Sequence, residues 1–167
     1  KSIPTKKKQI TIDVDSTDSE IHGNQQFGMF NGFYSKRMYH PLLFHDGDTG
    51  QLILPVLRAG NVHTSAGFVK ILDMMLERIR AKRPHLKIII RGDSGFGGSE
   101  FYRLVEKYDL YFCVGLRANR VLDSKIKIEK ECINNWFYKE NQEYKYFTDK
   151  IEYQAQSWDR PQNVYAR

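Results

Sequence analysis

The chain has 167 residues, of which 41% are hydrophobic and 28% charged, as is typical of one globular domain or one domain with a small insertion. No apolar run approaches the roughly 18 residues that a membrane span needs, and no signal segment opens the chain, so we expect a cytoplasmic protein without a membrane partner. Two cysteines are too few for a disulfide framework, whereas the net charge of +6 mildly favours nucleic acid as a partner.

Residues 1–8, KSIPTKKK, are predicted to form a solvated basic arm or linker, with a phosphate-contacting arm as the alternative. The next stretch, Gln9–Thr17, alternates as a strand does, with apolar residues on one face and polar ones on the other: Ile10, Ile12 and Val14 against Thr11, Asp13 and Asp15. Two carboxylates on one strand face are costly to bury unless each finds water, a cation or a metal. An edge strand with a solvated face and a central strand ending at a functional cleft both fit this stretch alone.

Amide and aromatic side chains mix over Asp18–Ser35 without a helical or strand period. We expect the aromatic side chains of this stretch to fill the core: Phe27, Phe30, Phe33 and Tyr34. Whether its amide side chains contact bases or sugars is left open. Lys36–His45 and Gln51–Arg58 are predicted to form a β-hairpin, because DGDTG between them is strong turn sequence. Its two aspartates could be calcium ligands, but an EF-hand loop needs a longer ligand series ending in Glu, so turn residues are the preferred interpretation.

A helix is predicted over Ala66–Lys82, with Thr64 or Ser65 as N-cap and a proline after its end. Asn61 and His63, just before it, could be catalytic, but a structural role is preferred.

Leu86–Arg91 has the apolar composition of a buried strand. Glycines flank Asp93 directly after it, which leaves that carboxylate accessible from several directions. A helix over Glu100–Lys107 and a strand over Leu110–Leu116 follow.

These elements predict a mixed five-stranded α/β sheet. The hairpin would lie antiparallel beside the first strand, and two right-handed crossovers would add the last two strands in parallel. The resulting order, 3-2-1-4-5, is the ribonuclease-H-like arrangement, in which the first and fourth strands end side by side. Asp15 and Asp93, 78 positions apart, would then face one another. Carboxylates that close repel each other, which indicates a site for divalent metal such as Mg²⁺ or Mn²⁺.

Five stretches in this order, DVDST, HGNQQ, PLLFHDGDTGQLILPVLRAGNVHTS, IIIRGDSGF and YFCVGLRAN, resemble the DDE transposase domain of bacterial insertion sequences over almost the whole chain. The resemblance implies that the first catalytic acid and metal ligand is Asp15, with Asp13 as the fallback, and that the second is Asp93. It implies metal-dependent phosphodiester hydrolysis at transposon ends and strand transfer into target DNA. It further implies double-stranded DNA as partner, allows a homodimer of the full-length protein, and places that protein in the bacterial cytoplasm near the nucleoid.

The C-terminal part departs from the family pattern. We expect the catalytic core over residues 9–120 and a β-rich insertion over 121–167, truncated before the third family acid, which is usually a Glu on a late helix. Glu152 alternates within a predicted strand and Glu100 lies on the wrong element, so neither fits. We therefore expect the isolated fragment to be inactive. Trp136 and Trp158 in the insertion could stack on bases, although core packing is preferred.

Five basic residues are candidate DNA phosphate contacts: Lys36, Arg37, Arg91, Arg117 and Arg120. Three alternatives to a transposase stay open: a ribonuclease-H-like nuclease without strand transfer, a non-catalytic nucleic-acid-binding domain of the same fold, and an interaction module without DNA affinity.

Overall fold

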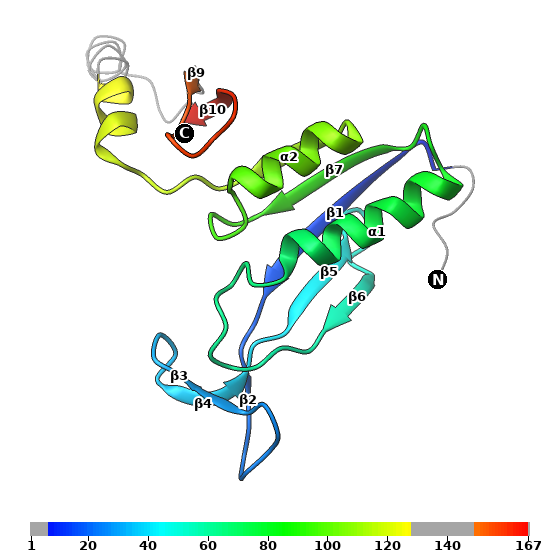
Figure 1. Ribbon diagram of the computed structural model, residues 1–167, viewed down its shortest axis with the longest axis vertical. Coiled ribbons are helices and arrows are strands. Elements are labelled where there is room, and N and C mark those ends of the chain that lie inside the picture. The colour runs from blue at the N-terminus through cyan, green and yellow to red at the C-terminus, as the bar shows by residue number, and fades with distance from the viewer. Residues whose placement is uncertain (1–6, 128–148, 167) are drawn as a thin grey trace, which may run out of the picture. The chain divides into compact units, whose positions relative to one another are not determined.

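The computed structural model describes residues 7–127 and 149–166, and the chain divides into two compact units, Lys1–Leu116 and Arg117–Arg167. The first unit contains a mixed five-stranded sheet (Figure 1). In spatial order its strands are β6 (Leu52–Val56), β5 (Leu42–Asp46), β1 (Gln9–Ser16), β7 (Lys87–Gly92) and β8 (Tyr111–Val114). β1 pairs antiparallel with β5 and parallel with β7, which in turn pairs parallel with β8. The expected mixed α/β class is confirmed, and β1 is a central strand rather than an edge.

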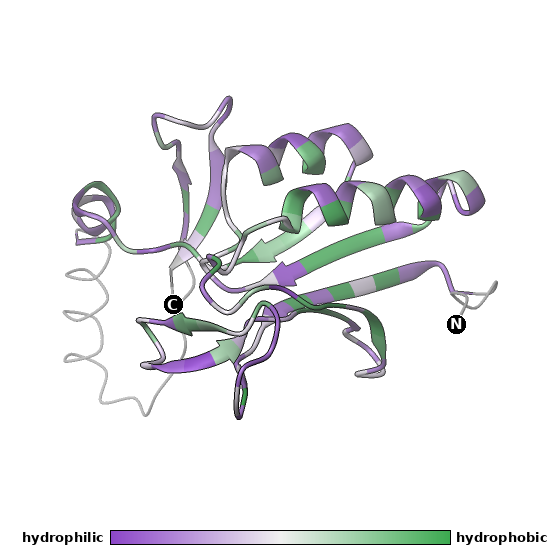
Figure 2. Ribbon diagram, turned by 60° about the horizontal axis from the view of Figure 1, so that its bottom comes forward, coloured by the Kyte–Doolittle hydropathy of each residue, from purple (hydrophilic) through white to green (hydrophobic). Residues whose placement is uncertain are grey.

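The core of this unit lies between the sheet and two helices, α1 (Phe68–Lys82) and α2 (Ser99–Tyr108), which cover the same face of the sheet (Figure 1). Alternate apolar residues of β1 and β7 are buried, as are Phe68, Leu72 and Leu76 of α1. Hydrophobic colours accordingly mark the central strands and part of each helix (Figure 2). The largest buried side chains of this core include Ile10, Ile12, Phe44, Phe68, Leu72, Leu76, Ile88, Ile90, Phe96 and Phe101. Burial of each contributes about 1.5–3 kcal/mol, which fixes β1 and β7 as the rigid centre of the fold.

A second, three-stranded sheet was not predicted. It has the order β2 (Ser19–Glu20), β4 (Lys36–Tyr39) and β3 (Met29–Asn31). The predicted strand Lys36–His45 is therefore two strands in two sheets. The chain changes sheet at His40–Pro41, where proline has no N–H to donate to a ladder. The phenylalanines around β3 are exposed, so the expectation that they fill the core is wrong.

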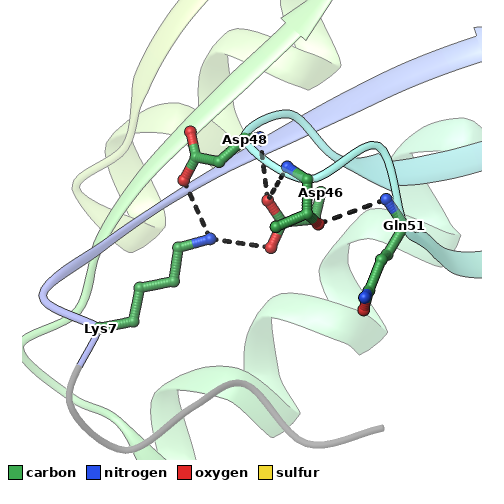
Figure 3. A network of polar contacts seen from close by, with 5 residues as sticks. Lys7, Asp46, Asp48 and Gln51 are labelled. Atoms are coloured by element: carbon green, nitrogen blue, oxygen red, sulfur yellow. Dashed lines mark hydrogen bonds and ion pairs between the residues drawn. The ribbon is translucent and has the colours of Figure 1, made fainter.

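The hairpin turn between β5 and β6 forms as predicted. The Asp46 carboxylate accepts hydrogen bonds from the backbone N–H of Asp48 at 2.9 Å and of Thr49 at 3.3 Å. The cation beside the two aspartates is Lys7, whose Nζ lies 2.8 Å from Asp46 and 2.9 Å from Asp48 (Figure 3). Lys8 is also bound, because its carbonyl accepts the N–H of Lys87 at 3.1 Å. The last two residues of the predicted arm thus belong to the folded unit, and residues 1–6 lie outside the described ones.

Helix α1 begins without the expected side-chain cap. Its N-cap is Gly67, whose φ of 73° is in the left-handed region that glycine adopts without steric cost. The Ser65 hydroxyl is instead 3.0 Å from Nδ1 of His63. At the other end, Arg80 donates to the carbonyls of Leu86 and Tyr108, each at 2.6 Å, so this basic residue joins the helix to its neighbours.

The second unit pairs β9 (Asp149–Tyr153) with β10 (Gln162–Ala166), and residues 120–127 are helical. Trp158 is buried and its ring stands edge-on to Tyr153, with centroids 5.4 Å apart, so it packs in a small core as preferred above. Trp136 lies outside the described residues. In the described parts of the chain, no helix is both long and apolar enough to cross a bilayer.

Candidate active site

Two aspartates lie at the ends of the central strands β1 and β7. The pairing of these strands keeps a constant offset from Gln9↔Lys87 through Asp13↔Arg91. The same offset, continued by two residues, puts Asp93 level with Asp15. Close contact persists one residue beyond Asp13 and Arg91, because a Cβ on Gly92 would lie 2.9 Å from Cγ1 of Val14. The register thus puts the backbones of Asp15 and Asp93 level at the carboxyl ends of adjacent parallel strands.

Both carboxylates are exposed and each uses one oxygen locally. Oδ1 of Asp15 accepts the N–H of Ser16, and Oδ1 of Asp93 accepts the N–H of Gly95, both at 2.7 Å. Within the part of the chain that the structure describes, their second oxygens have no protein partner. Mg²⁺ is often held by one or two carboxylates with water and phosphate oxygens, so this donor set fits it. Among the described residues, however, no three His, Cys, Asp or Glu side chains gather around one point.

The glycines around Asp93 permit close packing as well as access. A Cβ on Gly95 would lie 2.9 Å from both Oδ1 of Asp93 and Cγ2 of Thr64. A Cβ on Gly115, which follows β8, would lie 2.8 Å from the backbone nitrogen of Ser94. Real Cβ atoms do not approach so closely, so a larger residue at either position would displace the Asp93 turn. Thr64, expected only as a helix cap, is therefore a neighbour of the second acid.

Asp13, the fallback acid, is engaged by a predicted DNA contact. Arg91 donates through Nε to Oδ1 and through Nη2 to Oδ2 of Asp13, both at 2.6 Å. This bidentate bond raises the pKa of Arg91. Both oxygens of Asp13 are occupied, and the Arg91 charge is balanced within the protein. This pair competes with the metal role expected of Asp13 and with the phosphate role expected of Arg91.

The other candidate DNA contacts are divided between the two units of the chain. Lys36 is ion-paired with Asp18 and lies 3.8 Å from Glu20, and its hydrogen bond to Asp18 raises its pKa. Arg37, its neighbour on β4, donates to the carbonyl of Gly28 at 3.1 Å. The remaining two, Arg117 and Arg120, are exposed residues of the second unit.

Sequence reasoning missed Arg58, which organises the loop beside the site. Its guanidinium donates to the carbonyls of His40 at 2.7 Å, Thr64 at 2.7 Å and Ala66 at 2.9 Å. Burial lowers the pKa of Arg58. Through these bonds Arg58 fixes the loop that carries Thr64 against the Asp93 turn. No periodicity marks such a residue; its only signal is its place between a strand and a polar loop.

Comparison with known families identifies the chain. The family described as Transposase DDE domain group 1 matches residues 1–167. The chain belongs to this family. No curated protein sequence matches this DDE domain.

Solved structures of transposases and integrases resemble the DDE domain at low identity. A piggyBac transposase synaptic complex with hairpin DNA matches 66% of this chain and 23% of its own, at 18% identity and a TM-score of 0.47. The catalytic core domain of HTLV-2 integrase, in complex with magnesium, matches 79% of this chain and 74% of the integrase chain, at 13% identity and a TM-score of 0.37. A Mos1 transposase paired-end complex with the left transposon end matches 78% of this chain and 48% of the Mos1 chain, at 12% identity and a TM-score of 0.41. The DDE domain spans about a quarter of the piggyBac chain and half of the Mos1 chain.

Proposed function

We propose that this DDE domain is part of the catalytic core of a DNA transposase, with Asp15 and Asp93 as catalytic ligands of Mg²⁺ or Mn²⁺. The observation that carries the proposal is the parallel register of β1 and β7, which brings two exposed carboxylates level at the strand ends. When bound, the metal would supply activation of the attacking hydroxyl and stabilisation of the leaving oxygen of a phosphodiester. The reactions would be hydrolysis at transposon ends and strand transfer.

The protein's own residues orient the two acids and limit the local charge. The N–H groups of Ser16 and Gly95 each hold one oxygen of a carboxylate, which leaves the other directed at a ligand. Arg91 neutralises Asp13. A DNA phosphate approaching the site therefore meets two uncompensated carboxylates rather than three, which lowers the electrostatic repulsion that a metal must offset.

The donor set supports weak metal binding by this chain alone. The described residues supply two carboxylates and no third acid, so we expect affinity for Mn²⁺ in roughly the millimolar range and little or no DNA cleavage. We also propose double-stranded DNA, both transposon ends and target, as the partner of the whole protein. A homodimer of that protein in the bacterial nucleoid belongs to the same proposal.

A manganese titration tests the site directly. Mn²⁺ binding is followed by the electron paramagnetic resonance signal of the free ion, for the wild type, Asp15→Asn and Asp93→Asn. Asn accepts the same local hydrogen bonds but lacks the charge, so each variant should lose binding at least tenfold while keeping its fold. Asp109→Asn is the matched control, because Asp109 is exposed with a φ of 48° that Asn tolerates.

The outcomes separate the two acids of β1. Loss of Mn²⁺ binding in Asp15→Asn, with unchanged Mn²⁺ binding in Asp13→Asn, supports Asp15 as the metal ligand of β1. Loss in Asp13→Asn alone would make Asp13 the ligand and contradict it. Equal binding in all variants would leave the acids without a metal role and favour a non-catalytic domain of this fold.

A further inference from the structure

Three phenylalanines of the small sheet are exposed. Phe27 precedes β3, Phe30 lies in β3, and Phe33 follows it in the turn to β4; their exposed fractions are 63%, 61% and 88%. A phenylalanine normally buries most of its large apolar surface, so three together on one small sheet give up considerable stabilisation. All three lie within seven residues of the chain, and contiguous exposed apolar surface marks binding sites more often than scattered apolar residues do.

The backbone at Phe27 is held in a conformation that bulky residues avoid. Its φ is 64°, in the left-handed region that costs a side chain with a Cβ roughly 1–2 kcal/mol. Three hydrogen bonds hold this turn: Gly60 N–H to the Phe27 carbonyl at 3.3 Å, Gly28 N–H to the Gln25 carbonyl at 3.1 Å, and the Tyr39 hydroxyl to the Gln26 carbonyl at 2.9 Å. The ring gains little burial in return. Strain that packing does not repay is typical of functional positions.

A cation lies on the same face of the small sheet as the exposed ring of Phe30. Phe30 and Arg37 are paired residues of neighbouring strands, so their side chains share one face of the sheet. Arg37 is exposed and, among the described residues, has no carboxylate partner; its one bond is to the Gly28 carbonyl. Lys36, in contrast, is balanced by Asp18 and Glu20. The surface therefore combines flat aromatic faces with one uncompensated guanidinium.

We propose that Phe27, Phe30, Phe33 and Arg37, here called the aromatic platform, bind unpaired bases of a DNA strand. Rings that stack on bases next to a cation that meets the backbone are the common features of single-strand binding surfaces. Paired bases within a duplex do not expose their faces, so the platform should select strands with unpaired nucleotides. Exposed amides at residues 24–26 offer hydrogen bonds to base edges. This inference rests on the proposed function, since a transposase acts where DNA ends are opened.

Fluorescence anisotropy with three labelled DNAs tests the platform. The first is a blunt duplex, the second the same duplex with a six-nucleotide unpaired overhang, and the third carries an abasic overhang with the same phosphates. The wild-type chain should bind the overhang about 5- to 100-fold more tightly than the other two. Phe30→Ala, Phe33→Ala and Phe27→Gly should each lower that preference by about two- to fivefold and leave blunt-duplex affinity unchanged.

Two variants guard against loss of fold. Phe27→Gly removes the ring and suits the left-handed φ, so its thermal midpoint should not fall. Tyr111→Ala removes an exposed ring on β8, outside the platform, and should keep the full preference.

Equal affinity of the wild-type chain for all three DNAs would overturn the inference. So would platform variants that lose as much affinity for the abasic overhang as for the normal overhang. A third contradicting result would be concentration-dependent dimerisation of the chain that the platform variants abolish. The last would make a second copy of the chain the occupant. None of these outcomes bears on the Mn²⁺ titration at Asp15 and Asp93, so failure of the platform and failure of the proposed function are distinguishable.

Discussion

Replacing Arg58 with methionine should destabilise the first unit selectively. Arg58 donates three hydrogen bonds of 2.7–2.9 Å to carbonyls of His40, Thr64 and Ala66. Bonds from a charged donor contribute about 1.5–3 kcal/mol each, and their removal leaves the carbonyls unpaired. The cost of burying the cation, which also lowers the pKa of Arg58, is relieved in the variant and offsets part of this loss. The balance is about 2–4 kcal/mol lower free energy of unfolding.

Urea unfolding provides the assay, with two optical signals that separate the units. Both tryptophans fall in the residue range of the second unit, so their fluorescence reports on that unit. Among the described residues, most of the helix that gives circular dichroism at 222 nm lies in α1 and α2 of the first unit. Arg58→Met should shift the dichroism transition and leave the fluorescence transition in place. Arg58→Lys keeps the charge but has only one nitrogen to donate to three carbonyls. It should therefore lower the free energy of unfolding by about half as much as Arg58→Met does.

Arg78→Met is the matched control, because Arg78 is exposed on α1 and methionine has a similar helix propensity; its effect should stay within about 0.5 kcal/mol. A loss below about 1 kcal/mol in Arg58→Met would refute the reasoning, since the carbonyls would then be satisfied by water as well as by the guanidinium. An equal shift of the tryptophan transition would also contradict it.

Two further predictions concern stability. Gly60→Ala should lower the free energy of unfolding by roughly 3 kcal/mol in the same assay, because the new Cβ would lie 1.9 Å from the Met38 carbonyl oxygen. The control is Gly32→Ala, which should leave the free energy of unfolding unchanged because no atom lies within 4 Å of its new Cβ. Equal effects of the two substitutions would show that the backbone around Gly60 moves aside. The hydrogen bond from Lys7 lowers the pKa of Asp46, so the stabilisation by this pair is present above the unfolded pKa of about 3.9 and is lost as pH falls through the lower folded pKa. Asp46→Asn should therefore be less stable than the wild type by at most about 1 kcal/mol at pH 5, with the difference closing towards pH 2; a constant difference would assign the effect to the turn instead.

The sequence predicted the main sheet because its signals are local and periodic. The alternation of β1, the apolar run before Asp93 and the DGDTG turn each specify an element without help from distant residues. The small sheet was not predictable in the same way. Its strands are two to four residues long, too short to show a period, and they depend on pairing between distant segments. The exposed phenylalanines misled the prediction because aromatic residues in a loop usually fill a core.

Side-chain partners across the structure were likewise beyond sequence reasoning. That Arg91 pairs with Asp13 depends on a contact between residues 78 positions apart. That Arg58 binds Thr64 depends on the path of a loop without periodicity. The positions of Asp15 near the end of β1 and of Asp93 directly after β7 were predictable, because the apolar patterns of both strands are clear; the catalytic role of these residues stays a prediction.

The register of β1 against β7 explains why two aspartates of the same strand face have different neighbours. Strand alternation alone treats Asp13 and Asp15 as equivalent. The neighbouring strand alternates too, with Arg91 opposite Asp13 and Asp93 two residues further on. Parallel pairing therefore converts two similar carboxylates into a neutral ion pair and an acidic pair, one step apart along the strand. A slip of one residue would place Asp15 opposite Gly92 and turn the apolar residues of β1 away from the helices, so the packing of Ile10 and Ile12 in the core also fixes which aspartate lies level with Asp93.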